Sequence, residues 1–426
     1  MSSAPPLPPG TCTTRLANCL VPCFSSNALK VQDIYIDDNT GLITSPTSVR
    51  GTSTSPTTTI DCTDSIVSPG FIDIQLNGAY GVDFSSPVLT PTSINHVSTS
   101  LLSTGVTSYC PTLVSLSAPQ YAAILPTFEA LVDPSVLGVH AEGPFFNTKM
   151  RGAHLPANIL DPCFPSDDSV PSDASSVVDS VGSIFESIYS SKPRSPIILT
   201  TLAPELHGSL PLIEHLTSLG VTVSMGHTAA TYEQGLAGID SGATLLTHLY
   251  NQMTPFHHRN PGLIPLIALP PNDNLSSVNA RTPPYYSIIS DGIHCAPPSV
   301  RMAWAMSKKA ILVTDAMAAM GLPDGDHKLG SMSVTKKGIA AHLTNTATLA
   351  GSVVSLDFCV RQFRDFSGCS VVEALQVVTK NPADLLNQKS IGNLDVGSKA
   401  DLVRLDKDSL EVLQTFKMGK SVYERE

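Results

Sequence analysis

Three side chains that can bind a metal ion each follow a short apolar segment of this sequence. They are Glu142, His227 and His248. Two imidazoles and one carboxylate leave a coordination position open for water, which is the usual arrangement of a catalytic zinc site. The alternative is that each is an ordinary polar residue at the end of a strand. The combination of three at separate strand ends favours a metal site.

A fourth segment, Asp73-Ile-Gln-Leu-Asn77, has amide side chains at two positions where many metal hydrolases have histidines. Many metal hydrolases built on a parallel barrel have Asp-x-His-x-His on such a strand, and both histidines bind metal. Gln75 and Asn77 occupy those positions here. The substitution predicts either a loss of the metal chemistry or a single ion held by ligands elsewhere in the chain.

Two more polar residues are candidates for moving a proton and stabilising charge. Asp315 ends an apolar segment and could take a proton from an activated water and return it to a leaving amine. Its alternative role is a helix N-cap, because a helical stretch follows. His294, three residues after Asp291, could donate to a carbonyl oxygen as it becomes an oxyanion. Alternatively, His294 is a buried histidine with satisfied hydrogen bonds.

The segment 248–262 contains a cluster of potential cations, His257, His258 and Arg259. A guanidinium group matches the paired oxygens of a phosphate or carboxylate. The alternative is a solvated loop with one arginine. A local cation matters in this chain because the net charge is −11, so an anionic substrate must be bound against the overall field.

The composition excludes some partners. Of 426 residues, 42% are apolar and 14% are charged, so the chain can bury a large core but has no basic surface for nucleic acid or anionic membranes. Nine scattered cysteines without a CxxC pair suit free thiols in a reducing compartment. We see no signal peptide and no apolar run long enough to span a bilayer. We therefore expect a cytoplasmic protein.

About eight apolar segments alternate with helical stretches through the middle of the chain. They lie at 71–77, 106–112, 137–142, 197–202, 221–227, 245–248, 286–291 and 311–315. Near-continuous apolar runs are typical of parallel strands buried on both faces. Eight such units favour an α/β fold with a (β/α)8 TIM-like barrel, whose active site lies at the carboxyl ends of the strands.

The two ends of the chain have a different pattern. The proline-rich composition of residues 1–10 predicts a disordered tail. Short strands separated by turns in 11–67 and 390–426 predict a small discontinuous β-sandwich domain formed by the N- and C-terminal segments. Residues 68–389 are left for the metal-dependent barrel.

Eight motifs between residues 68 and 405 resemble, in order, those of the N-acetylglucosamine-6-phosphate deacetylases of the amidohydrolase superfamily. They are Pro69-Gly-Phe-Ile-Asp-Ile-Gln-Leu-Asn-Gly78, His140-Ala-Glu-Gly-Pro144, Leu202-Ala-Pro-Glu205, Gly226-His227-Thr, Thr247-His-Leu-Tyr-Asn-Gln-Met253, Asp291-Gly-Ile-His294, Val313-Thr-Asp-Ala316 and Leu349-Ala-Gly-Ser352. The resemblance implies a barrel with a small β-domain. It also implies hydrolysis of N-acetylglucosamine 6-phosphate to glucosamine 6-phosphate and acetate, in amino-sugar catabolism.

The resemblance further implies roles for individual residues. It assigns metal binding to Glu142, His227 and His248, acid–base catalysis to Asp315, and carbonyl polarisation to His294. Sugar and phosphate contacts fall on His154, Asn251, Gln252, Arg259, His294, Leu349, Ala350 and Gly351. The Gln75/Asn77 pair goes with one divalent ion per subunit, with zinc as the expected metal. Family members are commonly dimers, so we expect a homodimer in which Arg259 can reach a neighbour's site.

Some features depart from the family pattern. Residues 161–191, with an expected helix near 175–189, and residues 270–284 are longer than in compact bacterial members. His257 and His258 leave open which side chain meets the phosphate. Two other functions also stay open: a related amidohydrolase acting on another amide or a nucleobase, and a barrel without catalysis that serves as a scaffold.

Overall fold

The structure of the chain is a computed structural model. It describes residues 12–45, 56–160, 162, 195–269, 282–330 and 332–426. Three expectations lie wholly or mostly outside the described residues: the tail at 1–10, the stretch 161–191 with its helix near 175–189, and the stretch 270–284.

The chain divides into two compact units. Unit 1 consists of Met1–Asp73, Ser98–Ser108 and Leu356–Glu426, and unit 2 consists of Ile74–Val97 and Tyr109–Ser355. The domain boundaries expected between residues 67 and 68 and between residues 389 and 390 stay predictions.

Eight parallel strands form a nearly closed barrel, in the spatial order β15-β14-β13-β12-β11-β10-β9-β6. They are β6 (Phe71–Leu76), β9 (Val106–Leu113), β10 (Val139–Glu142), β11 (Ile197–Leu202), β12 (Thr222–Met225), β13 (Leu245–Leu246), β14 (Tyr285–Ile288) and β15 (Ala310–Leu312). A parallel bridge between Leu76 and Ala316 links the first strand to the chain beyond the last. The expected barrel is confirmed.

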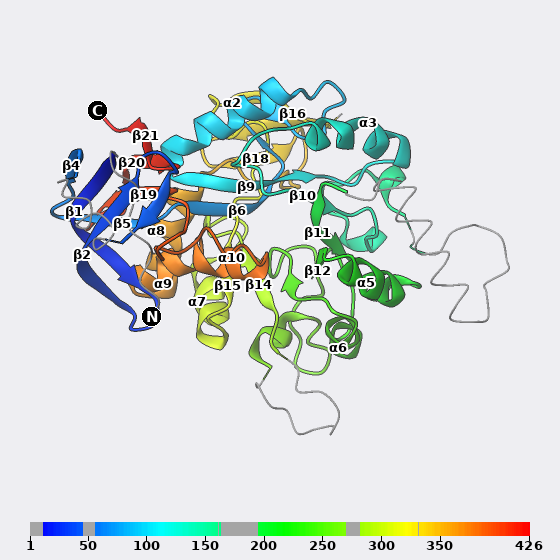
Figure 1. Cartoon of the computed structure of the whole chain (residues 1–426). Coiled ribbons are helices and arrows are strands. Elements are labelled where there is room, and N and C mark those ends of the chain that lie inside the picture. Colours follow the sequence, from blue (N-terminus) through cyan, green and yellow to red (C-terminus); the bar gives the residue numbers. More distant parts are fainter. Residues whose placement is uncertain (1–11, 46–55, 161, 163–194, 270–281, 331) are drawn as a thin grey trace. The chain divides into compact units, whose positions relative to one another are not determined.

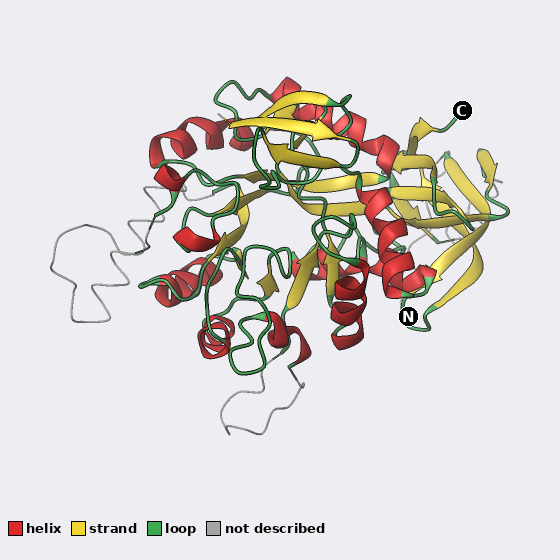
Figure 2. Ribbon diagram, turned by 180° about the vertical axis from the view of Figure 1, so that it is seen from behind, coloured by secondary structure: helices red, strands yellow, loops and turns green. Residues whose placement is uncertain are grey.

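The apolar runs explain why these segments are barrel strands. Five of the eight strands are buried at every residue, and the other three at all but one. A strand buried on both faces needs continuous rather than alternating apolar residues. In unit 2 the helices outside the strands supply the outer cover (Figures 1 and 2).

The helices of unit 2 connect successive strands and return the chain to the amino-terminal end of the barrel. They are α3 (Ala118–Glu129), α5 (Ser209–Ser218), α6 (Tyr232–Asp240) and α7 (Pro297–Met306), with the short helices η2 (Thr148–Met150), η3 (Pro156–Asn158) and η4 (Ile264–Ala268). Helix α5 buries Ser209, Leu212, Ile213 and Leu216, which is the spacing of one helical face. A capping box between Thr231 and Gln234 begins α6.

Helix α2 (Pro91–Leu101) precedes β9, with η1 (Leu102–Thr104) between them. No described helix is long and apolar enough to cross a membrane.

Strands from both ends of the chain share one mixed sheet in unit 1, as expected. Its order is β21-β20-β19-β5-β1-β2-β3, and β4 also pairs with β1. The strands are β1 (Thr13–Cys23), β2 (Ala28–Asp37), β3 (Leu42–Thr44), β4 (Thr58–Asp61), β5 (Ser65–Pro69), β19 (Leu402–Asp406), β20 (Val412–Lys417) and β21 (Lys420–Glu424). Leu16, Ile36, Val67, Leu402 and Phe416 belong to its buried core. Unit 1 also contains α8 (Leu356–Ser367), α9 (Val371–Gln376) and α10 (Lys380–Leu385).

Two small antiparallel sheets in unit 2 were not expected from the sequence. One joins β7 (Gly78–Ala79) to β8 (Val82–Asp83), and the other consists of β16 (Gly325–Leu329), β17 (Met332–Lys337) and β18 (Ala340–Leu343). The alternation in β17 and the Gly338 turn that follows it are a hairpin signal that could have revealed the second sheet.

Candidate active site

A cavity of about 640 Å³ in unit 2 brings together most of the polar residues singled out in the sequence. Its lining includes Glu142, His227, His248 and Asp315, which stand at or just beyond the carboxyl ends of four barrel strands. The carboxyl end of a parallel barrel is where residues from separate strands converge on one point. The register of the barrel therefore explains how residues so far apart in the sequence meet.

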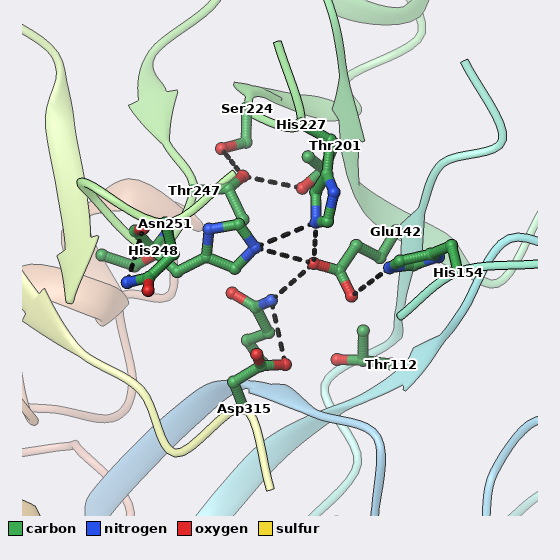
Figure 3. A network of polar contacts seen from close by, with 12 residues as sticks. Thr112, Glu142, His154, Thr201, Ser224, His227, Thr247, His248, Asn251 and Asp315 are labelled. Carbon is green, nitrogen blue, oxygen red and sulfur yellow. Dashed lines mark hydrogen bonds and ion pairs between the residues drawn. The ribbon is translucent and has the colours of Figure 1, made fainter. Parts of the chain in front are cut away.

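The expected metal ligands lie within hydrogen-bond distance of one another (Figure 3). Nε2 of His227 and Nε2 of His248 each lie 3.2 Å from Oε1 of Glu142, and the two nitrogens are 3.0 Å apart. All three side chains are buried. Burial alone raises the pKa of Glu142, but the facing histidine rings, His154 first, hold it well below its usual value.

The proton on His227 shows that this cluster fits a cation. Nδ1 of His227 donates to the carbonyl oxygen of Met150 at 2.8 Å. Burial lowers the pKa of His227 to about 4, so at neutral pH the ring has no second proton and Nε2 presents a lone pair. That lone pair and the Glu142 carboxylate face one another as two acceptors, which requires a proton or a metal ion between them. Ligands of one zinc ion at about 2.0–2.2 Å are themselves roughly 3.3–3.6 Å apart in tetrahedral geometry, slightly more than the separations here.

His154 lies near the same carboxylate but is a weaker candidate ligand. Ligand atoms of Glu142, His154 and His227 all lie within 4.8 Å of one another. However, Nδ1 of His154 accepts a hydrogen bond from the backbone N–H of Ser115 at 3.1 Å, so the ring proton is on Nε2. Nε2 lies 3.6 Å from Oε2 of Glu142. His154 therefore presents an N–H, rather than a lone pair, toward the carboxylate.

The backbone turns sharply where these side chains leave the strands. His227, His248 and Asp315 have φ values of 50°, 28° and 48°, in a region that few residues other than glycine adopt. Such conformations persist where the surrounding contacts hold them, and they concentrate at functional sites. After Glu142 the chain turns at Gly143, whose φ is also positive, at 96°. A Cβ atom at this position would lie 2.2 Å from Oγ of Ser115.

The amides of β6 support Asp315. Nδ2 of Asn77 donates to Oδ1 of Asp315 at 2.7 Å. Nε2 of Gln75 donates to the same oxygen at 3.2 Å and to Oε1 of Glu142 at 2.8 Å. The amides thus join the candidate proton acceptor to a candidate metal ligand. Burial, followed by the negative charge of Glu142, raises the pKa of Asp315 to about 6, which suits a group that must both take and release a proton near neutral pH.

His294 also lines the cavity and is held by Asp291. Its Nδ1 lies 2.6 Å from Oδ2 of Asp291, and Oδ1 of Asp291 accepts the backbone N–H groups of Ile293 and His294. Burial alone raises the pKa of Asp291, but these contacts with His294 lower it overall. Asp291 therefore orients His294, with the Nδ1 proton directed at the carboxylate.

The structure brings some expected substrate contacts together and leaves others apart. His154, Asn251, Gln252, Leu349 and Gly351 line the cavity, with His294. Ala350 is buried, and Arg259 is exposed and absent from the described lining. Gln75 lies under the lining, in contact with Glu142. The roles of all these residues stay predictions.

Sequence reasoning missed several residues around the cavity. Leu329 and Met332, from the unexpected β16–β18 sheet, form part of its wall. Ser115 fixes the proton on His154. No local pattern identifies Ser115, because its partner stands 39 residues further along the chain.

A nearly closed parallel barrel with a buried histidine–carboxylate cluster at the carboxyl ends of its strands defines the class of metal-dependent barrel hydrolases. The model of the amidohydrolase family matches residues 66–422. The chain is 39% identical over 416 residues to N-acetylglucosamine-6-phosphate deacetylase of Caenorhabditis elegans, covering 95% of this chain and 93% of the relative.

Two solved structures agree with this match. The N-acetylglucosamine-6-phosphate deacetylase of Thermotoga maritima is 27% identical, with a TM-score of 0.78 over 96% of this chain and 100% of that one. A mutant of the Mycobacterium smegmatis deacetylase in complex with N-acetyl-D-glucosamine-6-phosphate is 26% identical, with a TM-score of 0.78 over 97% and 99% of the two chains. The chain belongs to the N-acetylglucosamine-6-phosphate deacetylases of the amidohydrolase family.

Proposed function

We propose that this protein hydrolyses the acetamide bond of N-acetylglucosamine 6-phosphate, releasing glucosamine 6-phosphate and acetate. The observation that carries the proposal is the convergence of Glu142, His227, His248 and Asp315 in one cavity of a chain from this family. A scaffold without catalysis would have no need to keep that set.

Glu142, His227 and His248 would hold one divalent ion, with zinc as the expected metal. Their atoms are imidazole nitrogens and a carboxylate oxygen, which zinc prefers, and two of them face each other as acceptors. A bound ion supplies a water of lowered pKa and a Lewis acid for the carbonyl oxygen. The amides of Gln75 and Asn77 donate to Glu142 and Asp315, so their N–H groups point where a second ion would need lone pairs. This supports one ion per subunit.

Asp315 is the proposed proton carrier. Its carboxylate takes a proton from the attacking water and gives it to the amine nitrogen as the C–N bond breaks. Asn77 and Gln75 fix Oδ1 by hydrogen bonds. The other oxygen, Oδ2, is then the atom that can exchange the proton.

The oxyanion needs an N–H donor, and the two candidate histidines differ in what they present. His294 was expected in this role, but its Nδ1 proton is directed at Asp291, so its Nε2 donates only when the ring is positively charged. His154 has its proton on Nε2 in the neutral ring. The neutral ring of His154 can therefore donate to the carbonyl oxygen, whereas His294, held by Asp291, is kept as a substrate contact in the cavity.

The proposed phosphate contact is Arg259, and the proposed assembly is a homodimer. Arg259 is exposed, with the exposed His257 and His258 beside it. In the expected homodimer, Arg259 would reach the neighbouring subunit's site, and its exposed position outside the described cavity lining leaves it available for that contact. The eight cysteines of the described residues are free thiols, which supports a cytoplasmic location.

Acetate release tests the proposal. The purified protein, loaded with zinc, is assayed with N-acetylglucosamine 6-phosphate and with unphosphorylated N-acetylglucosamine, and its metal content is measured. We expect one ion per subunit, acetate release from the phosphorylated sugar, and loss of activity after chelation with recovery when zinc is returned. Equal rates on both sugars would refute the phosphate site, and full activity without metal would refute the metal site.

A further inference from the structure

Glu205 ends the motif Leu202-Ala-Pro-Glu205, which the proposed mechanism does not use. It follows β11 and is partly buried, and it is absent from the described lining of the cavity. Its contacts indicate another role.

Three donors converge on this carboxylate. Oε1 accepts the backbone N–H of Ala229 at 2.6 Å and Nδ2 of Asn147 at 3.0 Å. Oε2 accepts the hydroxyl of Thr228 at 2.5 Å. Thr228 and Ala229 directly follow His227, whereas Asn147 belongs to the segment after β10. Glu205 therefore ties together two segments that come from different strands.

The segment containing Asn147 also holds the ring of His227. Asn147 donates its backbone N–H to the carbonyl oxygen of His227 at 2.9 Å, and Met150 donates its own to the carbonyl oxygen of Asn147 at 2.9 Å. The carbonyl oxygen of Met150 then accepts the Nδ1 proton of His227 at 2.8 Å. The contacts form a closed loop from Glu205 through Asn147, Met150 and His227 back to Glu205.

This closed set of hydrogen bonds fixes both the backbone and the ring of His227. Its φ of 50° is an unfavourable backbone conformation, which persists only where the surroundings fix it. The ring must also keep its proton on Nδ1 so that Nε2 is free for an ion. Partners that orient a metal-binding histidine commonly change metal affinity by about 10- to 100-fold when they are removed.

We propose that Glu205 is a positioning residue that holds both the backbone and the ring of His227 in the geometry that binds the metal ion. The inference rests on the proposed function, because it requires the ion. It adds a residue from outside the cavity, acting through Thr228, Ala229 and Asn147.

The test measures zinc affinity of the folded apoprotein by competition with a chromophoric chelator. Glu205→Ala removes all three contacts, and we expect the zinc dissociation constant to rise about 10- to 100-fold. Glu205→Gln keeps an oxygen for Ala229 and Asn147, and its amide can donate to Thr228. Its affinity should therefore stay within about threefold of the wild-type value, which is an order-of-magnitude expectation from the retained hydrogen bonds. Glu214→Ala is the matched control, because Glu214 is an exposed glutamate on α5.

The thermal stability of each apoprotein separates positioning from general support of the fold. A Glu205→Ala protein that is less stable but binds zinc within about twofold of wild type would overturn the inference. If that variant fails to fold, Asn147→Ala removes the side-chain tie between Glu205 and the Met150 segment, together with the Oδ1 contact to the backbone N–H of Lys149. An unchanged zinc affinity there would overturn the inference equally. A wild-type protein that binds no divalent ion would instead refute the proposed function, and this inference with it.

Discussion

Two regions that the chemistry requires are built in opposite ways. The first is the inner cluster of Glu142, His227 and His248, in which every side chain is buried and lies within hydrogen-bond distance of another member. The second is the outer loop at residues 257–259, in which both histidines and the arginine are exposed. The inner cluster is complete within one chain, whereas the outer loop has no part of the described cavity lining.

The difference follows from what lies beneath each region. Under the inner cluster a chain of buried side chains links four adjacent strands. His140 on β10 meets Thr201 on β11 at 2.8 Å. Thr201 meets Thr247 beyond β13 at 2.8 Å, and Thr247 meets Ser224 on β12 at 2.5 Å (Figure 3). These contacts fix the relative heights of the strands that present the ligands. The outer loop has no such foundation among the described residues. Substitutions in the inner cluster should therefore affect the chemical step, and substitutions in the outer loop should affect substrate binding.

The largest effect is expected at Asp315. In Asp315→Asn the amide oxygen can still accept from Asn77, but the group can no longer take a proton. We expect kcat to fall by about 10²- to 10⁴-fold, the usual contribution of a positioned acid–base group. Zinc content, measured on the same sample, should be unchanged, because Asp315 is not an expected ligand.

Asp365→Asn is the control, because Asp365 is an exposed carboxylate on α8. It should leave kcat unchanged. A wild-type-like rate for Asp315→Asn would remove Asp315 from the mechanism, and a loss of zinc would show that its carboxylate helps to hold the ion.

A smaller effect is expected at Arg259. Hydrogen bonds to charged groups contribute about 1.5–3 kcal/mol, so Arg259→Ala should raise KM for the phosphorylated sugar roughly 10- to 100-fold. Activity on unphosphorylated N-acetylglucosamine should not change. Lys337→Ala, at an exposed lysine of β17, is the matched control. Equal losses on both sugars would exclude a phosphate contact.

Mixed oligomers decide which subunit uses Arg259. When Arg259→Ala and Asp315→Asn proteins are unfolded together and refolded, a mixed dimer has one site with an intact Asp315. If Arg259 serves the neighbour's site, that site also receives an arginine, and the low KM returns. If Arg259 serves its own site, no mixed dimer gains it.

The inner cluster could be predicted from the sequence because the barrel dictates it. Once apolar runs define parallel strands, residues at their carboxyl ends must converge, so Glu142, His227 and His248 could be grouped before their distances were known. The same reasoning gave Asp315 as a neighbour of the cluster. In each case the residue stands at a regular place in a regular element.

The other features of the site could not be predicted, because they depend on contacts between loops and on which histidine nitrogen carries the proton. Glu205 and Ser115 act through side-chain and backbone contacts between segments that are far apart in sequence, which no periodicity reveals. The Nδ1 partner distinguishes His154 from His294, and only the fold brings Ser115 and Asp291 to those atoms. Arg259 was recognised by its charge, but its surface position does not follow from its charge.

The smallest expected effect concerns stability, and it tests the foundation under the inner cluster. Burial lowers the pKa of His140 to about 4 in the folded protein, against about 6.5 in an unfolded chain. Between these values the unfolded chain binds a proton that the folded protein excludes, so stability falls as the pH falls. Acidification of the zinc-loaded protein from pH 6.5 to 5.5 should lower the free energy of unfolding by about 1 kcal/mol through this group. Urea denaturation at both pH values measures this change in the free energy of unfolding.

His140→Gln is the comparison for this measurement. The variant should show a shallower pH dependence, whatever its absolute stability, because its side chain does not titrate. If the unfolding free energies of the wild type and the variant changed equally with pH, His140 would be protonated inside the barrel. The hydrogen-bond network through Thr201 and Thr247 would then carry a charge directly under the ligands.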